Sequence, residues 1–151
     1  MSELVDPLRS AAEERPDDVA LEDARGELTW GELDARAGEL ALRLAGAGVA
    51  PGDRVACLLP VGREAALALH AVPRTGASLA PLHPGWTGPE TDHYLRRVRP
   101  RVLLCRPETA EGAAAAMRAS GLLVRLGPGT GEAGAADDGT GAVPAGELPA
   151  A

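Results

Sequence analysis

The chain has 151 residues and a mass of 15.4 kDa, and 45% of its residues are hydrophobic, which suffices for one compact domain with a buried core. Aromatic residues make up only 2% and Phe is absent, so the core is expected to consist of Leu, Val and Ala. A formal net charge of -7 and a pI near 4.9 argue against nucleic acid as a partner, because phosphate backbones are bound by basic surfaces.

The sequence carries no signal for a membrane or for export. It has no apolar stretch long enough to span a bilayer, and residues 1–18 are acidic and lack the apolar core of a signal peptide. We therefore predict a cytoplasmic protein. All 15 basic residues are Arg, and Lys, Ile, Asn and Gln are absent, a bias that is typical of GC-rich coding.

The first third of the chain predicts a helix, a hairpin and a second helix. An amphipathic pattern indicates a short helix over residues 5–14, and the runs 19–23 and 26–30 flank a turn and predict a small hairpin. Thr29 and Glu32 have the spacing of a capping box, which predicts the start of a helix. Its apolar face is expected to consist of Trp30, Leu33, Ala37, Leu40, Ala41, Leu44 and Ala45, and it ends at Gly46 and Gly48.

Residues 51–126 predict strands and helices in alternation. The expected elements are a strand at 54–59, a helix at 63–74, a strand at 78–81, a helix at 89–98, a strand at 101–105, a helix at 108–119 and a strand at 122–126. Pro73 is expected in a kinked last turn, and Thr87 with Glu90 gives a second capping box. Such alternation is typical of a parallel sheet covered by helices, so we predict a three-layer α/β domain over residues 1–126.

The tail, residues 127–151, is rich in Gly, Ala, Pro and acidic residues, which predicts a flexible, largely disordered segment. It contains a G-x-G-x-x-G pattern at Gly129, Gly131 and Gly134. A dinucleotide fingerprint needs a helix directly after the third glycine and a second βαβ half, and neither follows here. The pattern therefore favours a linker over a nucleotide site.

The loop 81–90 follows the carboxyl end of a predicted parallel strand, where open α/β sheets build their sites. His83 and Trp86 are the side chains in it that could contact a ligand. The alternative is a structural turn in which Trp86 packs over the sheet edge and His83 is solvated. Four arginines, Arg96, Arg97, Arg99 and Arg101, lie at a helix end, where they either oppose the helix dipole or form an anion site.

The remaining candidate side chains favour structural roles. His70 is expected to be a partly buried packing residue and His93 an exposed one. Cys57 and Cys105 lie in apolar runs, which predicts buried, reduced thiols, and the sequence offers too few partners for a metal site. No spacing supports a Ser/His/Asp, Cys/His or paired-carboxylate constellation, so we assign no catalytic, cofactor-binding or metal-binding residue.

Three blocks of the sequence occur in order, at a spacing that is plausible for one family: LTWGEL at 28–33, GVAPGDRVA at 48–56 and GASLAPL at 76–82. They resemble L-T-Y-x-E-L, G-V-x-x-G-D-x-V-A and G-A-x-x-x-P-L in the N-terminal segment of the adenylate-forming superfamily, which includes acyl- and aryl-CoA synthetases and adenylation domains of peptide synthetases. The resemblance covers residues 4–126. It implies ATP-dependent activation of a carboxylate to an acyl-adenylate and transfer of the acyl group to a thiol, with ATP, Mg and CoA as cofactors and substrates of a complete member.

The resemblance also implies that the reactive residues lie beyond the matched region, in a T-S-G-T-T-G-x-P-K-G phosphate loop and on a lysine of a small C-terminal domain. The segment DGTGAVPAG at 138–146 agrees with part of that loop, but Ala145 replaces its lysine and Asp138 its serine. It is either a degenerate phosphate loop or the connector before one. In some CoA-ligating relatives a basic residue in the loop after the third block approaches CoA, and Gly85 stands there in this chain.

Two hypotheses about function follow. In the first, the chain is the N-terminal portion of a carboxylate–CoA ligase, binds no cofactor alone, is inactive alone, and needs a second polypeptide with the rest of the ligase, or forms a homodimer. In the second, it is a stand-alone, non-catalytic binding module that kept the scaffold. The first predicts an exposed apolar face, and the second predicts a face covered with charge.

Overall fold

The computed structural model describes residues 6–106 and 122–125. The predicted helix at 108–119, the tail at 127–151, the glycines Gly129, Gly131 and Gly134, and the segment 138–146 lie outside the described residues.

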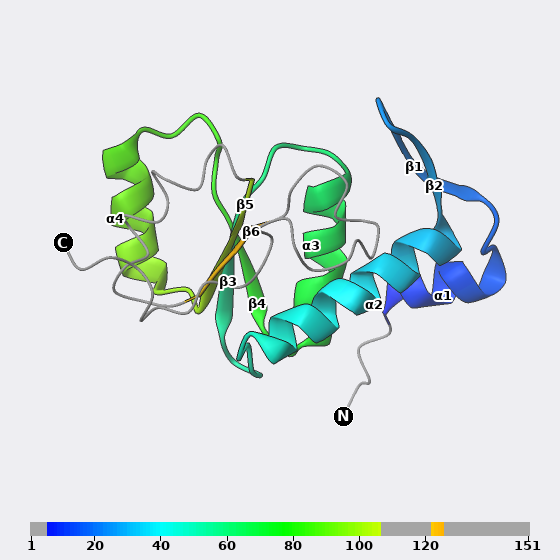
Figure 1. Ribbon diagram of the computed structural model, residues 1–151, viewed down its shortest axis with the longest axis horizontal. Helices are drawn as coiled ribbons and strands as arrows, with labels where there is room; N and C mark the ends of the chain where they lie inside the picture. Colours follow the sequence, from blue (N-terminus) through cyan, green and yellow to red (C-terminus); the bar gives the residue numbers. More distant parts are fainter. Residues whose placement is uncertain (1–5, 107–121, 126–151) are drawn as a thin grey trace.

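The N-terminal part consists of a helix, a two-stranded ribbon and a long helix (Figure 1). Helix α1 (Pro7–Glu14) starts at Asp6, whose carboxylate accepts hydrogen bonds from two backbone N–H groups of the first turn. Strands β1 (Val19–Asp23) and β2 (Gly26–Thr29) pair antiparallel and lead into α2 (Trp30–Gly46). The predicted hairpin and both helices are confirmed.

The start of α2 is fixed by the capping box that the sequence predicts. The Thr29 hydroxyl accepts a hydrogen bond from the Glu32 N–H at 3.2 Å, and the Glu32 carboxylate accepts one from the Thr29 N–H at 2.9 Å. The predicted apolar face is confirmed except at its end, where Ala45 is exposed. Ala47 is buried instead, because the chain turns back toward the core at Gly48, which has a φ of 88°.

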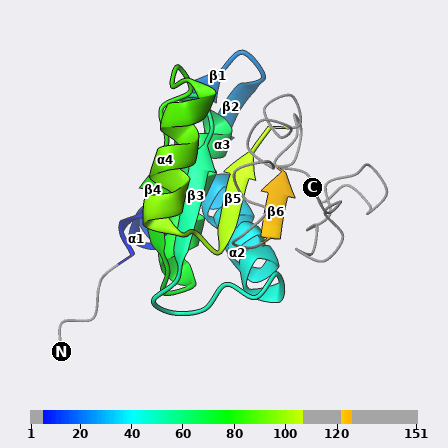
Figure 2. The ribbon, with the colours of Figure 1, turned by 90° about the vertical axis from the view of Figure 1, so that its left-hand side faces the viewer.

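A parallel sheet forms the centre of the molecule. Its strands are β3 (Arg54–Leu58), β4 (Ser78–Pro81), β5 (Val102–Cys105) and β6 (Leu122–Arg125), and Figure 2 shows them in the order β4, β3, β5, β6. All three pairings between them are parallel. Helices α2 and α3 (Arg63–Arg74) lie on one side of the sheet and α4 (Gly88–Val98) on the other (Figure 1). The predicted three-layer α/β architecture is confirmed.

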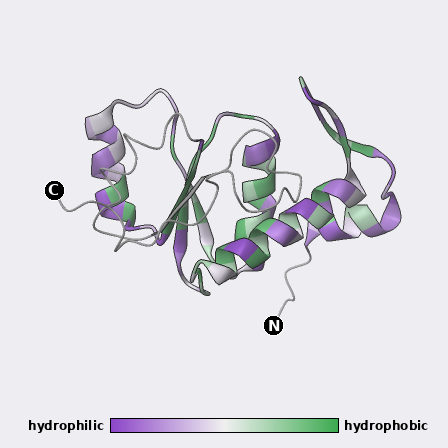
Figure 3. Ribbon diagram, viewed as in Figure 1, coloured by the Kyte–Doolittle hydropathy of each residue, from purple (hydrophilic) through white to green (hydrophobic). Residues whose placement is uncertain are grey.

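The core consists of Leu, Val and Ala with the two cysteines, as the composition predicts. On the side of α2 and α3, the sheet contributes Val55, Cys57, Val102 and Leu104. On the side of α4, a smaller cluster contains Ala56, Leu82, Leu95, Leu103 and Cys105. Along α2 and α3, hydrophilic and hydrophobic residues alternate, as amphipathic helices require (Figure 3).

The structure explains why a glycine opens the sequence block at 76–82. Gly76 follows α3 with a φ of 76°, and a Cβ at this position would lie 2.9 Å from the Cβ of Pro51. Its carbonyl accepts a hydrogen bond from the Gly52 N–H at 3.0 Å, which joins the turns that precede β3 and β4. Pro73 lies in the last turn of α3, as predicted.

Two leucines of α2 provide a matched test of the core. Leu44 has an exposed fraction of 0% and Leu42 of 76%. We expect Leu44→Ala to lower the free energy of unfolding by about 2–5 kcal/mol, because the substitution leaves a cavity beside the sheet. The same change at Leu42 should stay within about 0.5 kcal/mol. Urea unfolding followed by circular dichroism measures both, and equal losses would contradict the orientation of α2.

Candidate functional site at the carboxyl edge of the sheet

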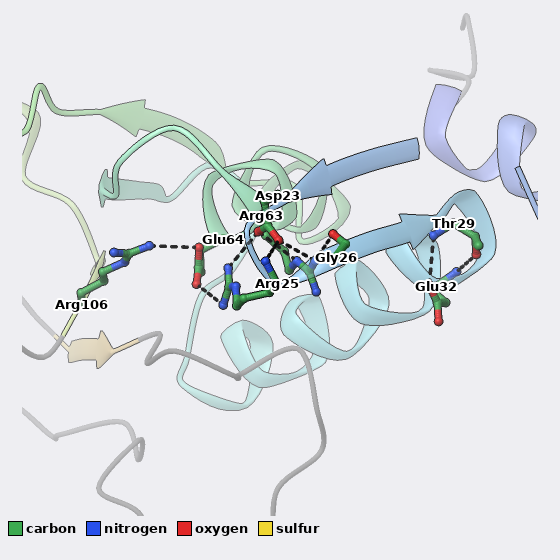
Figure 4. A network of polar contacts seen from close by, with 8 residues as sticks. All are labelled: Asp23, Arg25, Gly26, Thr29, Glu32, Arg63, Glu64 and Arg106. Atoms are coloured by element: carbon green, nitrogen blue, oxygen red, sulfur yellow. Dashed lines mark hydrogen bonds and ion pairs between the residues drawn. The ribbon is translucent and has the colours of Figure 1, made fainter. Parts of the chain in front are cut away.

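Charged side chains from three separate segments meet at the carboxyl edge of the sheet. Arg63 and Glu64 open α3 after β3, Arg106 follows β5, and the turn of the β1–β2 hairpin brings Asp23 and Arg25 (Figure 4). In the strand order β4, β3, β5, β6, the chain runs from β3 to its neighbour β4 at one edge of the sheet and from β5 to its neighbour β6 at the opposite edge. The cluster therefore lies where the strand order reverses, which is the usual place for a ligand crevice in open α/β sheets.

Arg63 joins the hairpin turn to α3. Its side chain, buried although charged, donates from Nη2 to Asp23 Oδ1 at 2.8 Å and from Nε to Asp23 Oδ2 at 3.2 Å. A third hydrogen bond runs from Nη2 to the Gly26 carbonyl at 2.8 Å. Burial alone would raise the pKa of Asp23, but the hydrogen bonds from the Arg25 backbone and from Arg63 hold it below its ordinary value.

Glu64 bridges two further arginines. Only 3% of this residue is exposed, and its carboxylate lies 2.8 Å from Nη1 of Arg25 and 3.4 Å from Nη2 of Arg106. Burial alone would raise its pKa, but the hydrogen bond with Arg25, a hydrogen bond with its own backbone and the charges of both arginines lower it. Glu64 is thus an ionised, paired carboxylate, and neither its pKa nor its surroundings suit a general base or a nucleophile.

The predicted ligand loop has a different arrangement. His83 is exposed, as the solvated interpretation expects, and its Nδ1 accepts a hydrogen bond from the Gly85 N–H at 3.0 Å. The ring of Trp86 packs against that of Tyr94 on α4, with 5.1 Å between the ring centroids, and 37% of Trp86 is exposed. Both rings line an open hollow of about 500 Å³ on the outer side of α4, together with Pro89, Glu90 and His93.

The four predicted arginines do not converge on one point. Arg96 pairs with Asp92 one turn earlier at 2.7 Å, and Arg99 ends α4 in a left-handed conformation with a φ of 49°. The Arg101 side chain lies over Gly48, near the end of α2. This arrangement favours the interpretation in which these cations complement helix ends over the anion site.

Both histidine predictions agree with the structure: His70, expected to be partly buried, is half-buried, and His93, expected to be exposed, is exposed. Burial lowers the pKa of His70, and nearby Asp6 and Asp34 oppose that shift. Both carboxylates bind the guanidinium of Arg74, at 2.8 Å for Asp6, which ties α1 and α2 to the end of α3.

Across the described residues, no group of three or more His, Cys, Asp or Glu side chains could hold a metal ion. Within the same residues, no helix has the length and the apolar character that a membrane crossing requires.

Sequence reasoning missed the carboxyl-edge cluster because the pairs that join its segments are far apart in the chain; Asp23 and Arg63, for example, are separated by 40 positions. One signal was present. The buried residues of α3 include Leu67, Ala68, Ala71 and Val72, and steps of three and four back along this stripe reach Arg63 and Glu64. Two charged residues on an apolar stripe indicate buried ion pairs.

The comparisons with known proteins agree with the resemblance. A sequence model described as AMP-binding enzyme matches residues 8–138. Feruloyl-CoA synthase of an Amycolatopsis species is 44% identical over 111 residues, which are 74% of this chain and 22% of that protein. Salicyl-AMP ligase / salicyl-S-ArCP synthetase of Mycobacterium tuberculosis is 41% identical over 92 residues, which are 58% of this chain and 16% of that protein.

Among solved structures, apo MatB from Rhodopseudomonas palustris superimposes with a TM-score of 0.69 at 34% identity, over 75% of this chain and 23% of MatB. A structure of MatB from the same organism with ATP bound matches with a TM-score of 0.67. The chain therefore spans less than a quarter of the length of these three relatives. The fold and the sequence point to the same part of the same family.

Glu64 offers a test of the cluster. We expect Glu64→Gln to lower the free energy of unfolding by about 1–3 kcal/mol at pH 7, because two arginines lose a buried anionic partner. The pKa of Glu64 is lowered in the folded chain from 4.5, so its contribution is present above that pH and is lost as the pH falls further. Urea unfolding at several pH values between 7 and 3 measures this. The free energies of unfolding of the unchanged chain and of Glu64→Gln should differ at pH 7 and become similar near pH 3.

The control for this series is Glu13→Gln on α1. The Glu13 side chain is 74% exposed and lies 3.8 Å from Arg9, so its substitution should leave stability nearly unchanged at every pH. A Glu64→Gln variant that behaves like this control would show that the buried carboxylate does not hold the cluster together.

The buried thiols give a second test. Burial raises the pKa of the Cys57 thiol to about 11, so little thiolate exists at pH 8. In a Cys105→Ala variant, where Cys57 is the sole thiol, we expect no fast reaction with Ellman's reagent in buffer and full reaction in urea. A native thiol that reacts within seconds would contradict the burial of β3.

Proposed function

The chain belongs to the family of AMP-binding enzymes, and we propose that it forms the N-terminal part of an ATP-dependent carboxylate–CoA ligase. The observation that carries this proposal is the agreement of fold and sequence over one stretch: 75% of this chain superimposes on 23% of MatB with a TM-score of 0.69 at 34% identity. The names of the relatives, feruloyl-CoA synthase and salicyl-AMP ligase, support an acyl or aryl carboxylic acid as the substrate class.

In the proposed reaction of the complete enzyme, the carboxylate attacks the α-phosphorus of ATP, pyrophosphate leaves, and an acyl-adenylate forms. The sulfur of CoA then replaces AMP at the acyl carbon, which gives the thioester. The described residues do not form a binding site for ATP or Mg. The arginines at the carboxyl edge are paired with Asp23 and Glu64, the described residues offer no metal cluster, and the sequence contains no lysine.

The part that this chain plays is therefore that of a scaffold. Its contribution is a parallel sheet whose carboxyl edge is held by ion pairs from the hairpin, α3 and the end of β5. The phosphate loop and the lysine of complete members have to be supplied by further polypeptide. We propose that the chain by itself is inactive and that it acts only together with those residues.

A chimera tests this proposal. In it, the 111-residue segment of the Amycolatopsis feruloyl-CoA synthase that matches this chain is replaced by the corresponding segment of this chain. We expect ferulate-dependent exchange of pyrophosphate into ATP within about tenfold of the parent rate, because the segment supplies scaffold and no reacting group, so the barrier changes by less than about 1.4 kcal/mol. The 151-residue chain alone should show no exchange with ferulate or salicylate.

Two controls make the result specific. Replacing the phosphate-loop lysine of the parent portion by Ala should reduce the exchange in the chimera and in the parent by the same factor. A folded chimera without exchange would favour the stand-alone binding module over the ligase. Exchange by the isolated chain would contradict its dependence on further residues.

A further inference from the structure

Two of the three aromatic residues of the chain meet at one open hollow beside α4. The sequence contains two Trp, one Tyr and no Phe. The rings of Trp86 and Tyr94 lie 5.1 Å apart between their centroids, with 57° between their planes, and both line the hollow of about 500 Å³. Trp86 is 37% exposed. In a chain with so few aromatic residues, two large rings that line a hollow indicate a binding site.

The two rings are held in place by the surrounding structure. Tyr94 packs against the smaller core cluster on the side of α4. Before Trp86, the chain forms a turn in which the Trp86 N–H donates to the His83 carbonyl at 3.1 Å and the Gly85 N–H donates to His83 Nδ1 at 3.0 Å. After it, Thr87 begins α4 with a capping box. The hollow therefore needs little reordering to bind a ligand, which reduces the entropic cost of binding.

The charged wall of the hollow is the carboxylate of Glu90. Its Oε2 accepts hydrogen bonds from the Thr87 N–H and from the Thr87 hydroxyl, both at 2.8 Å. The bond from the backbone, followed by that from the hydroxyl, lowers the pKa of Glu90, so this group is ionised at neutral pH. Among the described residues, no hydrogen bond or ion pair engages its Oε1. The hollow thus combines two ring faces with one fixed negative charge.

The third aromatic residue already has a cation of the chain over its ring. The guanidinium of Arg15 lies 5.3 Å from the ring centroid of Trp30, which is a cation–π contact. Within residues 6–106 and 122–125, no arginine lies over the ring of Trp86 or Tyr94 in the same way. The ring faces in the hollow are therefore available to a cation that the described residues do not supply.

The lining restricts the class of ligand. Glu90 repels a phosphate or a carboxylate. A neutral aromatic ring finds no slot between two rings that already contact each other, and it gains nothing from the carboxylate. A primary ammonium is compact and strongly hydrated. A trimethylammonium group presents a broad positive surface to both rings and to the carboxylate at once, and aromatic side chains bind such groups.

We propose that the hollow between Trp86, Tyr94 and Glu90 binds a small organic cation that carries a trimethylammonium group. The volume of about 500 Å³ lies in the range of small-molecule sites. The net charge of -7 favours the approach of cations over that of anions. The inference does not rest on the proposed function, because it concerns binding by the 151-residue chain itself, without ATP or CoA.

Titration with choline tests the requirement for charge. The reference ligand is the neutral alcohol of the same shape, in which a carbon atom replaces the quaternary nitrogen. In a Trp30→Phe variant of the 151-residue chain, Trp86 is the sole tryptophan and reports binding by its fluorescence. At constant ionic strength, we expect choline to bind at least about fivefold more tightly than the alcohol. Equal affinities, or an unchanged fluorescence throughout the choline titration, would overturn the proposal.

Two glutamates with the same capping role provide matched variants. Glu90 and Glu32 are each exposed and each complete a capping box at the third position of a helix. Glutamine preserves such a box without the charge. We expect Glu90→Gln to weaken choline binding at least about threefold and to leave binding of the alcohol unchanged, whereas Glu32→Gln should change neither. Equal losses of choline affinity in the two variants would show that the hollow is not the site.

Saturation-transfer NMR gives a second readout that does not depend on fluorescence. Transfer from the protein to the methyl protons of choline should be lost in Trp86→Leu and kept in Trp30→Phe, and the opposite pattern would contradict the assignment. A peptide with a trimethyl-lysine offers the same group on a protein. It should bind no more tightly than choline, and a peptide affinity more than about tenfold higher would overturn the assignment to a small ligand.

Discussion

Burial of two neighbouring parallel strands on both faces is the constraint on which the rest of this structure depends. Every side chain of β5 is inaccessible to solvent. Because successive residues of a strand point to opposite faces, such a strand has to be covered by apolar side chains on both sides. The chain meets this need with its connections. It crosses from β3 to β4 in one direction and from β4 past β3 to β5 in the other, and right-handed crossovers then place α3 and α4 on opposite faces.

The same topology creates the carboxyl-edge cluster. The connections that follow β3 and β5 run in opposite directions, so helices do not cover the ends of these two strands. An open α/β sheet commonly has a crevice at such a point. In this chain, Glu64 fills that place between Arg25 and Arg106, and Arg63 secures the hairpin beside it. Three arginines and two carboxylates compensate one another to within a single charge, and their ion pairs connect the N-terminal ribbon to the sheet.

Sequence reasoning predicted the elements better than the contacts between them. The bounds of α3 and β4 follow from periodicity and from Gly and Pro positions, which act over a few residues, and the sheet follows from the alternation of elements. Contacts such as that between Arg63 and Asp23 depend on how separate elements are oriented, and one sequence holds little information on that. Trp86 illustrates the difference: its loop was predicted, but its contact with Tyr94 depends on the rotation of α4.

The arginine-only composition, which reads as a coding bias in the sequence, has a structural effect. Arg63 binds both oxygens of Asp23 and a carbonyl at once, and Arg74 binds Asp6 and Asp34 together, which requires the planar fork of a guanidinium. A lysine in either place would present one compact charge and would leave acceptors unsatisfied. The forked guanidinium groups of Arg63 and Arg74 therefore join α1, the hairpin and α2 to the two ends of α3.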